Sequence, residues 1–274
     1  MLFPWADCHL WCRDHGLMMI APTWRTFRFG PLLRGEQDRR QYHKLFTAAS
    51  QMTGPEKWFR LLTSRRVRFS ESLELSACRG STVVVFNSLE IFHRLAGRQK
   101  ELREGLCAMT RPEYLPAPRS RPTIGVHVRL GDYLPPGSPP TPGCHYRLEL
   151  SWYRQALREV RRVAGSEVDA VVFSDGTDDE VRELLSEENV TRSPYRSAVT
   201  DLLALAESSI IIASCSTFSM WGSFLGQVPA IWHPGSRFRC VVAAEGPGGL
   251  EPEWRPSTPL SAPFAAAVRA RVLT

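Results

Sequence analysis

The stretch "TIGVHVRLGDY", residues 123–133, joins a short apolar run to a cluster of polar side chains. The run is rich in β-branched residues and has the length of a buried strand. His127, Arg129 and Asp132 follow at its carboxyl end. Because charged side chains are rarely buried unless they are paired, the pattern predicts that these three residues meet a partner or a ligand where the strand ends.

Beyond this strand, short apolar runs alternate with amphipathic segments. This regular strand–helix order is typical of an α/β fold with a doubly wound parallel sheet. Thr177 and Glu180 form a capping-box pattern at the start of one predicted helix. The expected strands are 123–129, 169–175, 210–214 and 229–234, and the expected helices are 151–164, 177–188, 198–209 and 217–226.

The first part of the chain shows a weaker form of the same order. A proline-rich stretch, residues 111–122, is the best candidate for a linker between the two parts. The elements expected before it are a helix at 5–16 that ends at Gly16, a buried strand at 17–24, helices near 38–50 and 55–63, a strand at 81–88 and a helix at 90–109.

Composition narrows the classes of ligand and location. The 274 residues carry a net charge of +6, which suits an anionic ligand. The sequence holds no dense run of Lys and Arg and no recognisable nucleic-acid module, so a nucleic acid is not expected. It also lacks a Cys-x-x-Cys pair and an apolar stretch of about 18 residues. We expect a cytoplasmic protein with reduced cysteines and without a transmembrane segment. Peripheral association with a membrane is compatible with this composition.

Polar clusters follow three of the predicted strands, and open parallel sheets bind ligands at their carboxyl ends. Asp175 follows the second of these strands, and "SCSTFS", residues 214–219, follows the third and opens a helix. A helix N-terminus with hydroxyl side chains favours an anion, and Arg129 can offer two parallel N–H donors. The sequence therefore predicts a phosphate or diphosphate site. Each cluster alone also fits a structural role, as a helix cap, a turn, or an ion pair between Arg129 and Asp132.

Three motifs in this half of the chain resemble those of the α-1,2-fucosyltransferases. They are "HVRLGDY" at 127–133, "VVFSD" at 171–175 and "DLLALAESSIIIASCSTFSMWGSFLG" at 201–226. The resemblance, to a family 11-like member of the HxRxxD fucosyltransferase superfamily, implies a GT-B-type fold of two Rossmann-like domains with parallel sheets. It also implies transfer of L-fucose from GDP-fucose, with inversion and without a metal, to a galactoside in α-1,2 linkage. No Asp-x-Asp pair, the usual ligand of a metal-bound sugar nucleotide, is present.

The resemblance also implies roles for the residues of the first motif. Arg129 would bind the β-phosphate of GDP and stabilise the leaving group. His127 and Asp132 would shape the donor pocket. The family usually has a second arginine where this chain has Leu130, which removes one cation from the expected site.

Two further groups of residues follow from the other motifs. Ser216, Thr217 and Phe218 would line the diphosphate and the fucose. Asp175 and Asp201 would support the site or contact the guanine. The partners implied are a nucleotide-sugar donor and a glycan acceptor, and no separate cofactor is expected.

The resemblance divides the chain into three parts. Residues 1–115 would form an acceptor-side Rossmann-like domain, residues 116–250 the donor-binding domain, and residues 251–274 a C-terminal tail or helix. Family members open with a strand and a glycine-rich loop, whereas this sequence opens with "MLFPWADC". We therefore expect the first strand and the glycine loop of the family to be missing here.

Three functions remain open on these grounds. The first is a bacterial glycosyltransferase that uses GDP-fucose to modify a glycan precursor. The second is a catalytically impaired protein that still binds a sugar nucleotide or a glycan, which the missing glycine loop and Leu130 favour. The third is a transferase of the same fold that uses another nucleotide sugar.

Overall fold

The computed structural model describes residues 2–22, 42–48, 51–70, 73, 80–87, 92, 94–137, 145–195, 197–242 and 249–272. The chain forms two compact units. The first comprises residues 1–26 and 41–112, and the second comprises residues 27–40 and 113–274. Among the described residues, no helix is both long enough and apolar enough to cross a bilayer.

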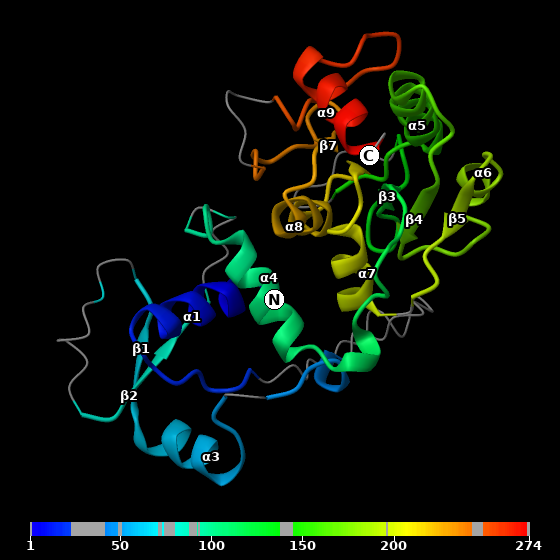
Figure 1. Ribbon diagram of the computed structural model, residues 1–274. Coiled ribbons are helices and arrows are strands. Elements are labelled where there is room, and N and C mark those ends of the chain that lie inside the picture. The colour runs from blue at the N-terminus through cyan, green and yellow to red at the C-terminus, as the bar shows by residue number, and fades with distance from the viewer. Residues whose placement is uncertain are drawn as a thin grey trace. The chain divides into compact units, whose positions relative to one another are not determined.

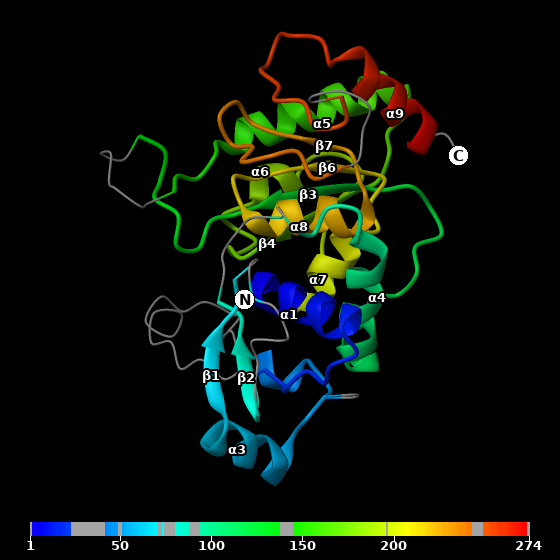
Figure 2. The same ribbon diagram turned by 90° about the vertical axis from the view of Figure 1, so that its left-hand side faces the viewer.

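The second unit is built on a sheet of five parallel strands in the order β5-β4-β3-β6-β7 (Figures 1 and 2). The chain runs outward from β3 to β5 and then returns to the other side of β3 to form β6 and β7. This reversal confirms the predicted doubly wound parallel sheet and puts its switch point between β3 and β6. The strands are β3 Ile124–Val128, β4 Ala170–Ser174, β5 Val190–Arg192, β6 Ile210–Ile212 and β7 Ala230–Ile231.

Helices cover both faces of this sheet (Figures 1 and 2). One face carries α5 and α9, and the opposite face carries α7 and α8, while the short α6 lies between β4 and β5 in the chain. The bounds are α5 Leu150–Ala164, α6 Arg182–Leu185, α7 Ala198–Leu205, α8 Thr217–Gly226 and α9 Ala262–Val272.

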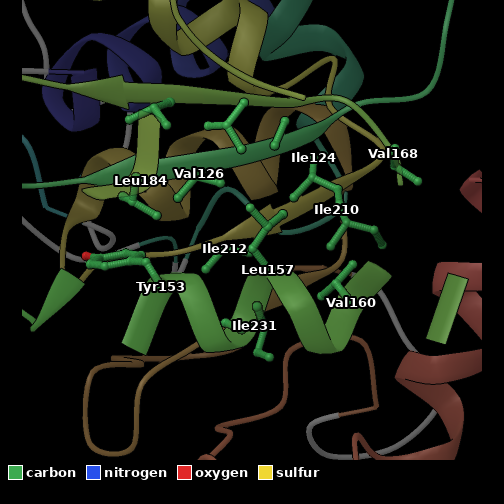
Figure 3. Packing of buried hydrophobic residues seen from close by; sticks show 14 of the residues in the cluster. Ile124, Val126, Tyr153, Leu157, Val160, Val168, Leu184, Ile210, Ile212 and Ile231 are labelled. Atoms are coloured by element: carbon green, nitrogen blue, oxygen red, sulfur yellow. The ribbon is translucent and has the colours of Figure 1, made fainter. Parts of the chain in front are cut away.

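Strand β3 alternates its side chains between these two layers, as a buried strand must. Ile124 and Val126 join the apolar cluster on the α5 face, where Leu157 of α5 also packs (Figure 3). Gly125 faces α7, and a Cβ atom there would lie 2.7 Å from a methyl carbon of Leu205. The absence of a side chain at this position lets α7 approach the sheet closely.

The first unit holds a two-stranded parallel sheet and three α-helices among its described residues. A partly buried ion pair of 2.6 Å between Asp7 and Arg94 joins α1 to the segment before the last helix of this unit. Two 3-10 helices, Tyr42–Lys44 and Pro112–Tyr114, lie in or beside this unit. The elements are α1 Leu2–Asp14, α3 Gly54–Thr63, β1 Arg65–Arg68, β2 Thr82–Val85 and α4 Gln99–Met109.

Several predictions for the first unit are wrong. The helix expected near 38–50 is only a 3-10 turn where it is described, followed by an isolated bridge from Phe46. Where the strand expected at 17–24 is described, at residues 17–22, one bridge forms at Ile20 and Met18 is 64% exposed; residues 23 and 24 lie outside the described residues. The helix expected from residue 90 begins only at Gln99. Local apolar content alone suggested these elements, and tertiary packing overrode it.

One predicted helix is shorter than expected, and two short strands were not predicted. The predicted capping box does form, because Thr177 N donates to Glu180 Oε2 at 2.9 Å and Glu180 N donates to Thr177 Oγ1 at 3.3 Å. The α-helix that follows nevertheless spans only Arg182–Leu185. Strands β1 and β5 were not predicted, since one is mostly arginine and the other has three residues. The functional division into acceptor and donor domains stays a prediction.

Candidate functional site

Three neighbouring strands of the second unit end in the polar clusters that the sequence singled out. Strands β4, β3 and β6 are adjacent and parallel, so their carboxyl ends share one edge of the sheet. The structure brings His127, Arg129, Asp132, Asp175 and the Ser214–Ser219 segment to this edge. We call this set the strand-end site. It lies at the switch point, where α/β sheets commonly bind ligands.

His127 links β3 to the first turn of α8. Its Nδ1 lies 2.7 Å from Ser219 Oγ and 2.9 Å from Ser214 Oγ, and its ring stacks on Phe218 with centroids 4.7 Å apart. Burial, together with the positive charge of Arg129, lowers the pKa of His127 to about 3. The imidazole is therefore neutral near pH 7, and these contacts position the start of α8.

The buried, neutral state of His127 should make stability depend on pH. The unfolded chain takes up a proton near pH 6.5 and the folded chain only near pH 3, so the contribution is complete above pH 6.5 and is lost as pH falls toward 3. From pH 7.5 to 5.0 this histidine should cost about 2 kcal/mol of unfolding free energy. Urea unfolding of the wild type and of His127→Asn at both pH values measures this change in the free energy of unfolding.

The variant should lose less stability than the wild type over this pH range. Asparagine keeps a polar group near the two serine hydroxyls but has no proton to bind. His15→Asn, at an exposed histidine, is the matched control. An equal pH dependence in the wild type and His127→Asn would contradict the buried neutral state.

Arg129 is held between two carboxylates. Its Nη1 lies 2.7 Å from Asp175 Oδ2, its Nη2 lies 2.6 Å from Asp132 Oδ1, and its guanidinium lies 5.6 Å from the ring centre of Tyr133. Burial alone would lower the pKa of Arg129, but the charges of Asp175 and Asp132 raise it above its ordinary value. Arg129 is therefore permanently charged, and Arg129, Asp132 and Asp175 together carry a formal charge of −1.

The two carboxylates differ in their other contacts and in their exposure. Asp175 accepts a hydrogen bond from Leu130 N at 2.8 Å and so fixes the backbone just after β3. A Cβ atom at Gly131 would collide with the same carboxylate, which explains the glycine. Asp132 is 44% exposed, so it is the carboxylate that an incoming anion can replace on Arg129.

The N-terminus of α8 faces the same edge. Ser216 caps the helix, with Oγ accepting from Phe218 N at 3.2 Å, and Ser219 Oγ accepts from Ser214 N at 3.1 Å. The first N–H groups of a helix have no partner within it, and the helix dipole favours negative charge there. Thr217 is exposed in this first turn, where its hydroxyl adds a possible donor.

Two residues of the sequence analysis fall outside this set, and the supporting or guanine-side role expected of Asp201 stays a prediction. Asp201 is in the first turn of α7, where its Oδ1 accepts from Ser193 Oγ at 2.5 Å, so it belongs with the loop after β5. Leu130 is 5% exposed and packs in the apolar cluster on the α5 face. Its side chain packs into the core, and the expected effect of lacking an arginine here stays a prediction.

Sequence reasoning missed a tyrosine that closes the site. Tyr133, the last residue of the opening stretch, donates from its hydroxyl to the carbonyl oxygen of Cys215 at 2.5 Å. It thereby joins the loop after β3 to the loop before α8. No local signal marks this contact, because its partners are 82 residues apart. In the described part of the chain, no group of three or more His, Cys, Asp or Glu side chains gathers as a metal site would.

Comparison with known families agrees with this geometry. Residues 98–231 match the model of glycosyl transferase family 11. The match contains the whole strand-end site and the five parallel strands that carry it. It supports a glycosyltransferase of family 11, the family type to which the sequence motifs pointed. Among curated proteins, none matches the chain.

Proposed function

We propose that this protein is an inverting glycosyltransferase of the family 11 type that moves L-fucose from GDP-fucose to a sugar hydroxyl, with an α-1,2-linked galactoside as product. The observation that carries the proposal is that Arg129 and the N-terminus of α8 follow two adjacent parallel strands, β3 and β6, at the switch point of the sheet. The family match over residues 98–231 supports it. In a GT-B-type arrangement, the second unit would bind the donor and the first would face the acceptor.

In this proposal the diphosphate lies at the first turn of α8. The helix N–H groups and the Thr217 hydroxyl donate to its oxygens, and Arg129 exchanges Asp132 for a phosphate oxygen while it keeps Asp175. When the C1–O bond of the sugar breaks, its electron pair stays on the β-phosphate oxygen. Donors already aimed at that oxygen stabilise the added charge, which lowers the barrier.

The acceptor completes the transfer. Its hydroxyl oxygen attacks C1 from the face opposite the diphosphate, which inverts the configuration, and a base takes the hydroxyl proton. GDP then leaves with the electron pair of the broken bond. The reaction as proposed uses no metal, because Arg129 and the start of α8 supply the positive charge that the leaving group needs.

A nucleotide panel tests the donor. We expect calorimetry to show tighter binding of GDP and GDP-fucose than of UDP and ADP, and GDP-fucose to bind at least as well as GDP. Release of GDP in the presence of a panel of galactosides tests the transfer. Tighter binding of UDP or ADP would assign another nucleotide sugar to the site.

A second candidate function rests on the charge of the strand-end site. Arg129 is matched by two carboxylates, so the site as a whole is not cationic. Such a site fits a protein that binds a sugar nucleotide or glycan without turning it over. Tight GDP-fucose binding with no GDP release across the galactoside panel would favour this candidate over the enzyme.

A further inference from the structure

Tyr153 lies beneath the strand-end site with an unsatisfied hydroxyl. Its side chain comes from the first turn of α5 and is 1% exposed. Figure 3 shows its ring above α5, with the oxygen directed toward the carboxyl ends of the strands. Among the described residues, this oxygen has no hydrogen-bond partner of acceptable geometry. A buried hydroxyl without a partner is unfavourable, so its retention calls for a reason.

The surroundings of this hydroxyl belong to the strand-end site. The charges of Cys215, Tyr133 and Asp175 act on this hydroxyl, and the Ser214 side chain lies within hydrogen-bonding reach of it but not in acceptable hydrogen-bond geometry. These residues come from the loop before α8, the loop after β3 and the end of β4. Burial raises the pKa of Tyr153 above its ordinary value, so the group keeps its proton and can only donate or accept as a neutral hydroxyl.

We infer that the Tyr153 hydroxyl donates a hydrogen bond to an oxygen of the diphosphate that binds at the start of α8. The inference rests on the proposed function only in taking the ligand to be a diphosphate. It unites two independent features, the donor-rich N-terminus of a ten-residue helix and a buried hydroxyl that makes no hydrogen bond of acceptable geometry in the described part of the chain. A diphosphate oxygen would satisfy the hydroxyl that the ligand-free site leaves unpaired.

The inference predicts that Tyr153→Phe weakens ligand binding without lowering stability. Removing an unpaired buried hydroxyl should leave the urea midpoint unchanged or raise it. Removing a donor to a charged oxygen should weaken ligand binding by roughly ten- to a hundred-fold. Tyr195→Phe is the matched control, because the Tyr195 hydroxyl already accepts from Ala117 N at 3.1 Å. The control should lose some stability and keep its ligand affinity.

The experiment measures unfolding by urea and binding of inorganic pyrophosphate and GDP by calorimetry, on the full chain. Weaker binding of both ligands by Tyr153→Phe, without loss of stability, supports the inference. A lower midpoint with unchanged affinities shows a structural hydroxyl and overturns it. Weaker GDP binding with unchanged pyrophosphate binding overturns the contact with the diphosphate.

Pyrophosphate separates this inference from the proposed function. If the wild type binds pyrophosphate but not GDP, the guanine donor is wrong, while the effect of Tyr153→Phe on pyrophosphate binding still decides the contact. If the wild type binds neither ligand, the start of α8 is not an anion site, and the inference is overturned.

Discussion

Replacing Arg129 with alanine should lower kcat by roughly 10²–10³-fold, the usual loss when one preorganised donor to a developing negative charge is removed. Asp175 holds the guanidinium in place at 2.7 Å, so Arg129 has only to release Asp132, at 2.6 Å, before it meets the leaving diphosphate. The variant also leaves two carboxylates at the ligand edge without their cation, which should weaken GDP binding. Initial rates of GDP release and calorimetry with GDP measure both effects.

Two further variants separate this role from a structural one. Arg129→Lys keeps a charge but loses the planar fork, so its rate should fall between those of the wild type and the alanine variant. Arg158→Ala removes an exposed partner of Glu187 and should leave the rate unchanged. A near-normal rate for Arg129→Ala would refute the leaving-group role. Loss of the folded state in that variant would show that the two ion pairs serve stability.

Gly226→Ala should reduce the free energy of unfolding by about 3 kcal/mol. Gly226 ends α8, and a Cβ atom there would collide with the backbone carbonyl oxygen of Ala206 and lie 2.8 Å from its carbonyl carbon. Because the obstacle is backbone just after α7, relief requires one of the two helices to shift. Urea unfolding of the variant gives the change in free energy.

Gly222→Ala is the matched control on the same helix. The three heavy atoms nearest to its new Cβ atom all belong to the side chain of Leu205, the first at 2.8 Å, and a leucine side chain can adjust. Alanine also favours a helix interior over glycine by about 1 kcal/mol, which offsets part of the contact. We therefore expect a clearly smaller loss for Gly222→Ala. Equal losses in the two variants would mean that α7 yields easily at Ala206.

The strand-end site was predictable in outline because the chain order alone places it. Apolar runs before His127, before Asp175 and before Ser214 predicted strands, and intervening helices imply parallel strands whose carboxyl ends share one edge. Helix α8 occupies the predicted residues 217–226. The signals were strong there because β3, β4 and β6 are mostly apolar and Ser216 marks the start of α8.

Pairings within the site could not be predicted in the same way. The sequence suggested Asp132 as the partner of Arg129, three residues away, and the structure adds Asp175, which directly follows the neighbouring strand β4. His127 meets Ser219 across 92 residues. Such contacts depend on the register between strands and on the packing of α8, and no local pattern encodes either.

The amino-acid sequence by itself determined the alternating order of strands and helices in the second unit, the edge at which its polar residues gather, and the family resemblance that they carry. Periodicity and capping are properties of neighbouring residues, so they can be read along the chain. Tertiary structure alone decided that Leu130 turns into the core, that three-residue β5 pairs with β4, and that the Tyr153 hydroxyl lies unpaired under the site. These outcomes are set by packing between distant segments, where burial outweighs local preference.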